Sequence, residues 1–318
     1  INPHKHITPE LAEEIVKIEG SILVDKERTG IGISTALSNI PKTINAPDIL
    51  VVPNIITADD KRLNKKRNGG FAKNKRNVIF FYSGSGQKEL SDYSNVDLIV
   101  CVADSYLHKG LDKIESRYQF IDEDHTAKIQ SGLRVNLYWL YEKIKHKTNV
   151  TYVTATPYQN DTPDVVIKNT HSSHKEIKKV HVSVCHKKTM ERLKVCLNDL
   201  KSEERILIAS NEGRKVNEIL NELGVKEVRL MSGVGFRSTF LEHSNVIIND
   251  TAAITIMTTS AFEGHDVYDE NTSVFVFQNY ANKIVQFLDC QIIQALGRPR
   301  KKPKYLHINW GGGNGVPY

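Results

Sequence analysis

Two adjacent carboxylates follow an apolar run in the first half of the chain, where Phe120-Ile121 leads into Asp122-Glu123-Asp124-His125. At the C-terminal end of a strand this pair would suit phosphoryl transfer, because one carboxylate can hold Mg²⁺ through water while the other polarises the attacking water. A polar turn with a helix start is the structural alternative, since acids also favour the first turn of a helix. This segment alone supports both interpretations equally.

A glycine-rich segment near the N-terminus could bind phosphate. It reads Thr29-Gly30-Ile31-Gly32-Ile33-Ser34-Thr35 and lies between an apolar run, Ser21–Val24, and a helix-compatible stretch, Ala36–Ile40. Glycines let backbone N–H groups surround phosphate oxygens at a helix N-terminus, and a Ser or Thr hydroxyl there can bind Mg²⁺. A phosphate loop of this type normally has Lys directly before the Ser or Thr, but Ile33 occupies that place. Alone, the segment is weak evidence for nucleotide binding.

Two later segments carry groups that suit the same chemistry. Thr154-Ala155-Thr156 ends an apolar run and is followed by Pro157, so two hydroxyls lie at the end of a predicted strand. The second segment, Gln294–Lys301, contains Arg298 and Arg300 and follows a helix-compatible stretch. Guanidinium groups near a γ-phosphate stabilise the charge that develops during transfer. Taken alone, the first segment is only a turn, and the second is better explained as a basic, solvated helix end.

An α/β alternation runs through the whole chain and would position these segments. Apolar runs are each followed by turn residues and a helix-compatible stretch. The predicted strands are Ser21–Val24, Asp48–Val52, Val78–Tyr82, Val96–Val102, Tyr118–Ile121 and Val150–Thr154, then Val180–Val184, Arg205–Ala209, Glu227–Leu230, Asn245–Ile248, Ala253–Thr258, Ser273–Gln278 and Tyr305–Ile308. Several are apolar throughout, which is typical of parallel strands covered on both faces. We therefore predict an α/β fold with mostly parallel sheets flanked by helices.

The chain length and a change in composition predict two domains. A chain of 318 residues is long enough for two ordinary domains. The segment Gln159–Lys179 is rich in polar residues and poor in large apolar ones, which is typical of a linker. We expect an N-terminal domain over 1–160, a linker over 161–179 and a C-terminal domain over 180–318.

The composition excludes several classes of protein. Hydrophobic residues make up 40% and charged residues 25% of the chain, which excludes a disordered or collagen-like protein. No apolar run approaches the roughly 18 residues of a membrane span, and the four cysteines form no Cys-x-x-Cys pair. We therefore expect a cytoplasmic protein, in the host cytoplasm if it is viral, with neither a zinc ribbon nor a disulfide framework. The first residue is Ile1 and no secretory signal is visible, so we expect a fragment or a processed product.

The net charge of +6 is concentrated rather than spread. The run Lys61–Arg76 contains eight Lys or Arg and no acid. Such a run is either a solvated face or a contact with the phosphates of a nucleic acid, made here by Lys65, Lys66 and Arg67. The sequence supports both interpretations equally.

Two other segments have competing interpretations. The run Ser83-Gly84-Ser85-Gly86 could imitate a phosphate loop, but no Lys followed by Ser or Thr comes after it, and a loop touching a nucleic-acid backbone is favoured. Tyr138 and Trp139 could stack on bases, but aromatic residues on a helix are more often part of the core, which is the interpretation we adopt.

In their order along the chain, the segments resemble the conserved motifs of superfamily-two helicases. The resemblance spans roughly residues 20 to 310. The matching segments are Thr29–Thr35 for motif I, Val51-Val52-Pro53 for motif Ia, Asp122–His125 for motif II, Thr154–Thr156 for motif III, Thr258–Asp266 for motif V and Gln294–Lys301 for motif VI. A single match is easily obtained by chance, whereas six matches in the correct order are not.

The resemblance implies two tandem RecA-like domains, with ATP bound between them and nucleic acid lying across both. The implied ligands of the phosphates and of Mg²⁺ are Thr29, Gly30, Gly32, Ser34 and Thr35, around the variant Ile33. In the other motifs, Asp122 would hold the metal, Glu123 would be the catalytic base, and Thr154 and Thr156 would couple the nucleotide site to the nucleic-acid site. Gly264 and Asp266 would sense the nucleotide, and Gln294, Arg298, Arg300 and Lys301 would act on it during hydrolysis.

Ile33 is the largest departure from the family. It replaces the Lys that neutralises the β- and γ-phosphates, so an active site would need another cation, for which Lys26, Arg28, Arg298 and Arg300 are the candidates. A second departure lies in motif VI, where Lys301 stands at the place of the last arginine and Arg300 comes one residue early. A substituted phosphate-loop lysine also resembles helicase-like proteins of crAss-like tailed phages.

The resemblance implies a nucleic-acid-dependent NTPase of helicase type, which uses ATP and Mg²⁺ to move along or remodel DNA or RNA. We expect DNA in preference to RNA. The alternative is a helicase-like module that binds nucleic acid, or serves as an assembly platform, without hydrolysis. Ile33 favours the alternative, whereas the acids and the motif VI residues favour the enzyme.

Overall fold

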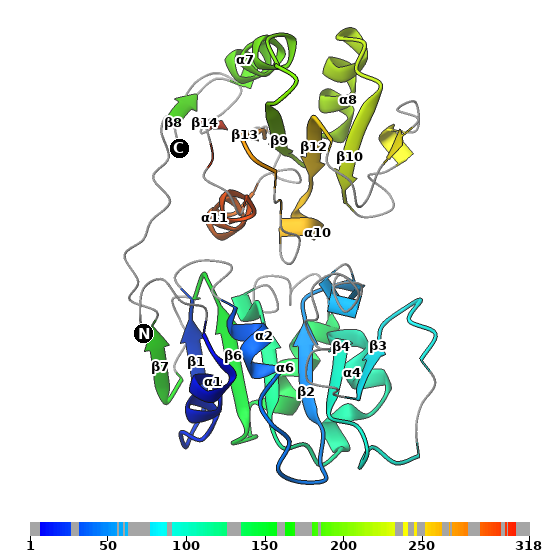
Figure 1. The fold of residues 1–318 in the computed structure, drawn as a ribbon, viewed down its shortest axis with the longest axis vertical. Helices are drawn as coiled ribbons and strands as arrows, with labels where there is room; N and C mark the ends of the chain where they lie inside the picture. The colour runs from blue at the N-terminus through cyan, green and yellow to red at the C-terminus, as the bar shows by residue number, and fades with distance from the viewer. Residues whose placement is uncertain are drawn as a thin grey trace. The chain divides into compact units, whose positions relative to one another are not determined.

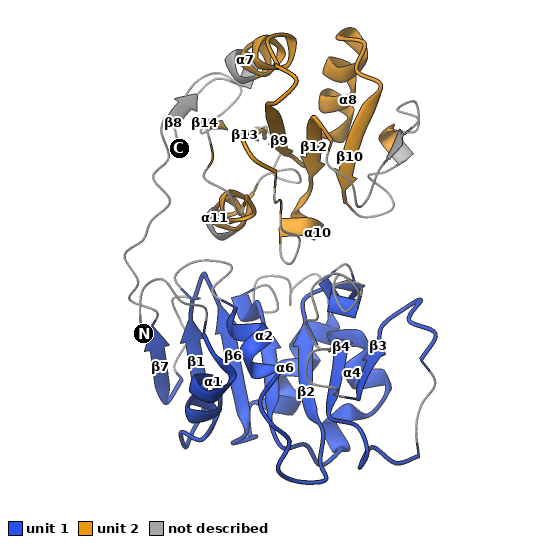
Figure 2. Cartoon of the chain, in the orientation of Figure 1, with its two compact units in different colours: residues 1–173 blue, residues 174–318 orange. Residues whose placement is uncertain are grey.

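Each half of the chain forms a parallel sheet, because its apolar runs are too short for helices and are buried on both faces. In the computed structural model the chain divides into two compact units, residues 1–173 and 174–318 (Figure 2). None of the described helices is long and apolar enough to cross a membrane. The structure describes residues 7–26, 32–55, 57–59, 61–62, 77–87, 91–125, 135–157, 163–168, 180–183, 186–232, 238–240, 245–246, 252–262, 267, 269–278, 287–299, 303 and 305–309.

The first unit contains a sheet of seven strands in the order β3-β4-β2-β5-β6-β1-β7 (Figure 1). All neighbouring strands are parallel. The strands are β1 (Ile22–Asp25), β2 (Asp48–Val52), β3 (Val78–Phe81), β4 (Leu98–Val102), β5 (Gln119–Asp122), β6 (Val150–Thr154) and β7 (Val165–Lys168). The first six confirm the strands predicted for this half, and the mostly buried side chains along them explain their continuous apolar sequences.

Strand β7 lies inside the segment predicted as a linker, so that prediction is wrong for residues 165–168. β7 pairs with β1 from Ile22 opposite Val165 to Asp25 opposite Lys168. The backbone N–H and the hydroxyl of Ser21 donate to Asp164 Oδ2 at 2.7 and 2.8 Å, which anchors the start of the strand. As an edge strand it alternates between half-buried and exposed residues, so it needs few apolar side chains. Because the residues around it are polar, the sequence pattern did not identify it as a strand.

Helices cover both faces of this first sheet. On one face lie α1 (Pro9–Val16) and α2 (Ile33–Leu37), whose buried residues join one apolar cluster with alternate strand residues. On the other face, α4 (Ala103–His108) and α6 (Val135–Ile144) join a second cluster. The short 3₁₀ helix η1 (Leu111–Lys113) follows α4. A sheet enclosed in this way leaves its strand ends as the place where polar side chains can gather.

The second unit repeats this architecture with seven strands in the order β11-β10-β12-β9-β13-β14-β8. All of its pairings are parallel. The strands are β8 (Val180–Ser183), β9 (Arg205–Ala209), β10 (Glu227–Met231), β11 (Asn245–Val246), β12 (Ile254–Met257), β13 (Thr272–Val276) and β14 (Tyr305–Asn309). Each corresponds to a predicted strand, and the predicted α/β fold with mostly parallel sheets is confirmed.

In the described part of the second unit, four helices and a 3₁₀ helix flank the sheet. They are α7 (His186–Asn198), α8 (Gly213–Glu222), η2 (Ser238–Phe240), α10 (Thr259–Phe262) and α11 (Asp289–Gly297). Residues of α7, α8 and η2 pack in one apolar cluster with β9, β10, β12 and β13. Residues of α10 and α11 pack in another cluster against the same sheet.

Candidate active site

The candidate site lies where three adjacent strands of the first sheet end. β5, β6 and β1 are neighbours in the sheet and parallel, so their C-terminal ends meet at one edge. Lys26 follows β1, Asp122 ends β5, and Thr154 ends β6. The backbone N–H of Lys26 donates to the carbonyl of Thr154 at 2.7 Å, which fixes the exit of the chain from β1.

The side-chain oxygens of Ser34 and Asp122 are in contact at the strand ends. Gly32, just before α2, has φ of 80°, a left-handed conformation that glycine adopts without strain. Ser34 in the first turn of α2 donates its hydroxyl to Asp122 Oδ1 at 2.8 Å. Mg²⁺ is usually bound by one or two protein oxygens together with substrate phosphates and waters, so this pair fits that metal. Thr35, the next residue, is exposed.

Glu123 stands beside Asp122 in a strained conformation. Its φ is 52°, which is uncommon for a residue with a side chain and costs on the order of 1–3 kcal/mol. Its carboxylate is buried, and its Oε1 accepts a hydrogen bond from Lys26 Nζ at 2.9 Å. The left-handed backbone therefore ends β5 with two consecutive carboxylates that share one ammonium group.

Two lysines neutralise these acids. Lys26 is buried, and its Nζ also lies 3.4 Å from Asp122 Oδ1. Lys61, which follows β2, places its Nζ 3.7 Å from Asp122 Oδ2. Burial raises the pKa of Asp122, but the two ammonium groups and the hydrogen bond from Ser34 outweigh burial and lower that pKa below its ordinary value. Asp122 is consequently an anion at neutral pH and can hold a metal ion.

The hydroxyl of Thr154 connects to the same acids through His125. Nδ1 of His125 lies 2.8 Å from Thr154 Oγ1 and 3.7 Å from Glu123 Oε2. The backbone N–H of Thr156 donates to Thr154 Oγ1 at 3.1 Å. Nearby, the hydroxyl of Tyr141 on α6 donates to Asp124. The two segments that the sequence placed in motifs II and III are therefore in direct contact.

Ile33 does not take part in this polar cluster. Its side chain is 1% exposed and belongs to the apolar cluster formed by α1, α2 and one face of the sheet. The position that carries a phosphate-binding lysine in other phosphate loops thus contributes to the core here.

In the second unit, Gln294 and Arg298 lie one turn apart on α11 and its C-terminal end. Arg298 Nη2 donates to Gln294 Oε1 at 2.6 Å, and its Nε donates to the Gln294 carbonyl at 3.2 Å. Both residues are almost fully buried, so a solvated helix end is the wrong interpretation for them. The carbonyl of Arg298 accepts from the backbone N–H of Val267 at 3.0 Å, which ties the helix end to the segment after motif V.

Several predicted site residues lie outside the described residues. They are Thr29 and Gly30 of the phosphate loop, Lys65, Lys66 and Arg67 of the basic run, Gly264 and Asp266 of the predicted motif V, and Arg300 and Lys301 of the predicted motif VI.

The sequence analysis did not predict Lys61 as a residue of this site, although the structure describes it there. It belongs to the basic run, but its proximity to Asp122 depends on β2 lying beside β5 in the sheet, and a single sequence does not reveal strand order.

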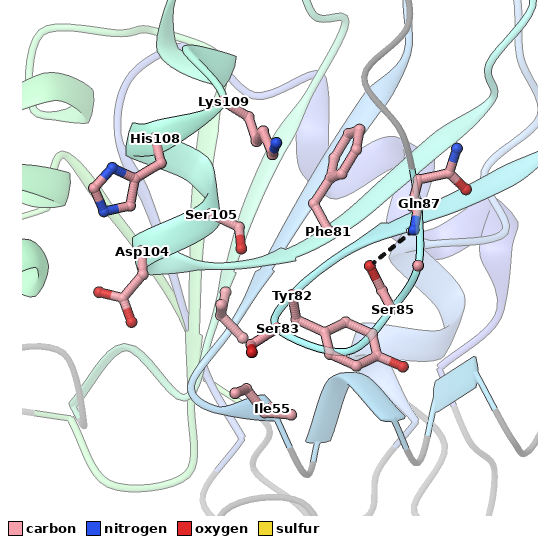
Figure 3. A pocket seen from close by; sticks show the side chains of 12 residues that line it. Ile55, Phe81, Tyr82, Ser83, Ser85, Gln87, Asp104, Ser105, His108 and Lys109 are labelled. Carbon is pink, nitrogen blue, oxygen red and sulfur yellow. Dashed lines mark hydrogen bonds between the residues drawn. The ribbon is translucent and has the colours of Figure 1, made fainter.

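A second polar site lies at the ends of β3 and β4. A pocket of about 390 Å³ opens there, and Figure 3 shows the loop after β3 facing the side chains of α4 across it. Tyr82 beside the pocket donates its hydroxyl to Asp59 at 2.7 Å, and Arg62 lies over its ring, 5.8 Å from the centroid. Burial and the hydrogen bond to Asp59 raise the pKa of Tyr82 to about 12. The lining residues include Ser83, Ser85, Gln87, Ser105, His108 and Lys109.

Tyr138 and Trp139 are not core residues. They are 48% and 50% exposed on α6, where their rings contact each other edge to face at 5.3 Å. The prediction that they belong to the core is wrong because Leu137, Leu140 and Ile144 supply the buried face of this helix.

Comparisons with known proteins support the architecture. No protein-family model matches the chain, and no curated protein matches it. Among solved structures, Saccharomyces cerevisiae Dbp5 bound to RNA and ADP BeF3 matches 98% of this chain and 85% of its own with a TM-score of 0.69 and 13% identity. The Escherichia coli DEAH/RHA helicase HrpB matches 95% of this chain and 42% of its own, with a TM-score of 0.59 and 14% identity. At these identities the likeness establishes the fold, which is that of tandem RecA-like domains.

Proposed function

We propose that the chain is a nucleic-acid-dependent NTPase of helicase type, which couples ATP hydrolysis to movement along, or remodelling of, DNA or RNA. The observation that carries the proposal is the convergence of Ser34, Asp122 and Glu123 on one ammonium-neutralised cluster at the strand ends of the first unit. Ser34 lies 88 positions from Asp122 in the sequence, and together the three residues supply groups that phosphoryl transfer requires.

In this proposal, Asp122 and Ser34 hold Mg²⁺, which when bound neutralises charge on the phosphates. Glu123 orients the attacking water and accepts its proton. This role suits its carboxylate, because Glu123 directly follows Asp122 at the end of β5 and has a left-handed backbone conformation. Gly32 turns the chain into α2 and, with Thr29, Gly30 and Thr35, contributes to the phosphate loop.

The motif III contact supports a coupling role for Thr154 and Thr156. His125 contacts both Thr154 and the Glu123 carboxylate. A displacement of the segment that contains Thr154 would therefore move His125 and change the position of the proposed catalytic base, Glu123. In the second unit, Gln294 and Arg298 are buried and contact each other, and the resemblance assigns both residues to hydrolysis. Gly264, Asp266, Arg300 and Lys301 complete this assignment as proposals.

We propose that nucleic acid binds the first unit through Lys65, Lys66 and Arg67. The pocket at the ends of β3 and β4 lies next to the start of this basic run, because Tyr82 contacts Asp59 and Arg62 there. We expect DNA in preference to RNA, whereas the Dbp5 structure contains RNA, so both polymers belong in the test.

The alternative function is a module that binds nucleotide or nucleic acid without hydrolysis. It is favoured by the burial of Ile33 in the apolar cluster, since no cation can act from that position. It is disfavoured by the retention of both carboxylates at the end of β5.

Phosphate release from ATP tests the proposal. We expect hydrolysis by the full chain, stimulated severalfold or more by single-stranded RNA or DNA or by the corresponding duplexes, and absent in the Glu123→Gln chain. ATP binding without hydrolysis under every condition would support the alternative. Absence of ATP binding would overturn both functions.

A further inference from the structure

We infer that Lys26 is the phosphate-binding lysine of this site and replaces the side chain lost at position 33. This inference rests on the proposed function, because it assigns a residue to the ATP of that function. Of the four candidate cations suggested by the sequence, Arg28 and Arg300 lie outside the described residues, and Lys26 is the candidate whose described contacts reach Asp122 and Glu123.

The first argument is the position of Ile33. Its side chain is buried among apolar residues of α1, α2 and the sheet. An ammonium group there would face hydrocarbon instead of the carboxylates, so the cation must enter the site from another part of the chain.

The second argument is where the Lys26 ammonium lies. Nζ is 2.9 Å from Glu123 Oε1 and 3.4 Å from Asp122 Oδ1, and the same Asp122 oxygen accepts the Ser34 hydroxyl at 2.8 Å. A ligand that bridges Ser34 and Asp122 through a metal ion must therefore lie next to this ammonium group. The phosphates of a bound nucleotide would be such a ligand.

The third argument is that Lys26 is held in the site at both ends. Its backbone N–H donates to the Thr154 carbonyl, and its side chain is 5% exposed. Lys26 is the first residue after β1, in the loop that leads to α2. Its four-carbon side chain allows the ammonium group to shift toward a bound anion while the backbone stays in place. Lys61 also neutralises Asp122, at 3.7 Å, so Asp122 keeps a cation when Lys26 turns to the phosphates.

The alternative role for Lys26 is a structural ion pair, and the two roles differ in their dependence on the phosphate chain. A phosphate-binding lysine stabilises ADP and ATP but contributes little to AMP, which has neither β- nor γ-phosphate. A lysine that only holds the fold would affect all three nucleotides alike.

The test measures equilibrium binding of ATP, ADP and AMP, with Mg²⁺, to the full-length chain and to Lys26→Met, Lys26→Arg and Lys42→Met variants. Met keeps the length of the side chain without its charge, and Arg keeps the charge. Lys42 is the matched control, because it is also partly buried in the first unit and donates to the carbonyls of Ser94 and Val96, away from the site. Thermal unfolding of each variant checks that it is folded.

We expect Lys26→Met to weaken ATP and ADP binding roughly tenfold to a hundredfold, with AMP binding unchanged, as for the loss of one charge-assisted contact. Lys26→Arg should retain most of the affinity, and Lys42→Met should equal the natural chain. Equal loss for all three nucleotides, or no loss for ATP, would overturn the assignment of Lys26. If the natural chain binds no ATP, the proposed function itself fails, so the two failures are distinguishable.

Discussion

The two units share one architecture but assemble their predicted catalytic groups in different ways. In the first unit, Lys26 and Ser34 reach Asp122 across 96 and 88 positions of the sequence. In the second unit, Gln294 and Arg298 contact each other across four positions, within about one helical turn. The first cluster therefore exists only when the sheet has formed, whereas the second pair forms with a single helix.

This difference bears on how the proposed site accommodates Ile33. The first cluster takes its charged groups from several loops. In our proposal, Lys26 at the end of β1 therefore supplies the cation that is absent at position 33. The Gln294–Arg298 pair instead takes both of its groups from one helix and its C-terminal end. Variants in the two units should therefore differ in whether they change catalysis or stability.

The largest expected effect is that of Glu123→Gln in the first unit. The amide keeps the shape of the carboxylate but cannot accept a proton, so hydrolysis should fall by roughly 10²–10⁴-fold while nucleotide binding stays largely intact. Steady-state phosphate release and equilibrium ATP binding measure the two quantities. Arg298→Lys in the second unit is the comparison, because it should lower thermal stability as well as turnover. Full turnover in Glu123→Gln would remove this residue from the mechanism.

The next effect is on stability and tests whether the units unfold independently. Each unit contains a buried Arg–Asp pair: Arg117 donates to Asp48 at 2.9 and 2.6 Å in the first, and Arg229 donates to Asp269 in the second. Replacing either arginine by Met leaves a buried carboxylate without its cation, which costs about 3–5 kcal/mol.

Differential scanning calorimetry should show that Arg117→Met and Arg229→Met each lower the transition of their own unit only. Lys194→Met is the control, since its ion pair with Glu222 is exposed and should contribute at most about 1 kcal/mol. A single transition that shifts equally in both arginine variants would mean that the units do not unfold separately.

A smaller effect is expected for Ile33→Lys. The new side chain must leave the apolar cluster or bury its charge, so the variant should be destabilised by about 1–3 kcal/mol without a gain in hydrolysis. Ile33→Leu is the control, which should cost less than about 1.5 kcal/mol. A sharp rise in hydrolysis in the lysine variant would show that the natural chain is a weakened NTPase or a binding module, and would contradict a role for Lys26.

The smallest effect concerns nucleic-acid binding by the basic run. Replacing Lys65, Lys66 and Arg67 by Ala should weaken binding of single strands and reduce the slope of log K against log salt by about 2, since each lost phosphate contact removes roughly 0.7. Substitution of Lys194 and Lys215 in the second unit is the control. An unchanged salt slope would leave only a solvated face for this run.

Much of the fold could be predicted because continuous apolar runs identify buried parallel strands. Thirteen predicted strands correspond to strands of the structure, and among the described residues β7 alone was missed, since an edge strand needs few apolar residues. Residue types and order also identified Ser34, Asp122, Glu123 and Thr154 as parts of one site. The structure brings these side chains into contact with one another, and their roles in catalysis stay predictions.

Other features of the site depend on strand order and packing, which one sequence does not determine. Lys61 reaches Asp122 because β2 lies beside β5, and nothing in the composition of the basic run indicates this. Whether Ile33 faces the phosphates or the core is decided by how α2 packs on the sheet. The exposure of Trp139 likewise depends on which face of α6 is buried.

The most direct test is a crystal structure of the full chain with Mg²⁺ and a non-hydrolysable ATP analogue. We predict a metal ion held by Ser34 and Asp122, and Lys26 Nζ at about 2.7–2.9 Å from a β- or γ-phosphate oxygen, as in other charge-assisted hydrogen bonds. Ile33 should remain in the apolar cluster. Phosphates bound tightly at this site with no cation near them other than Mg²⁺, or bound away from Asp122, would contradict the account.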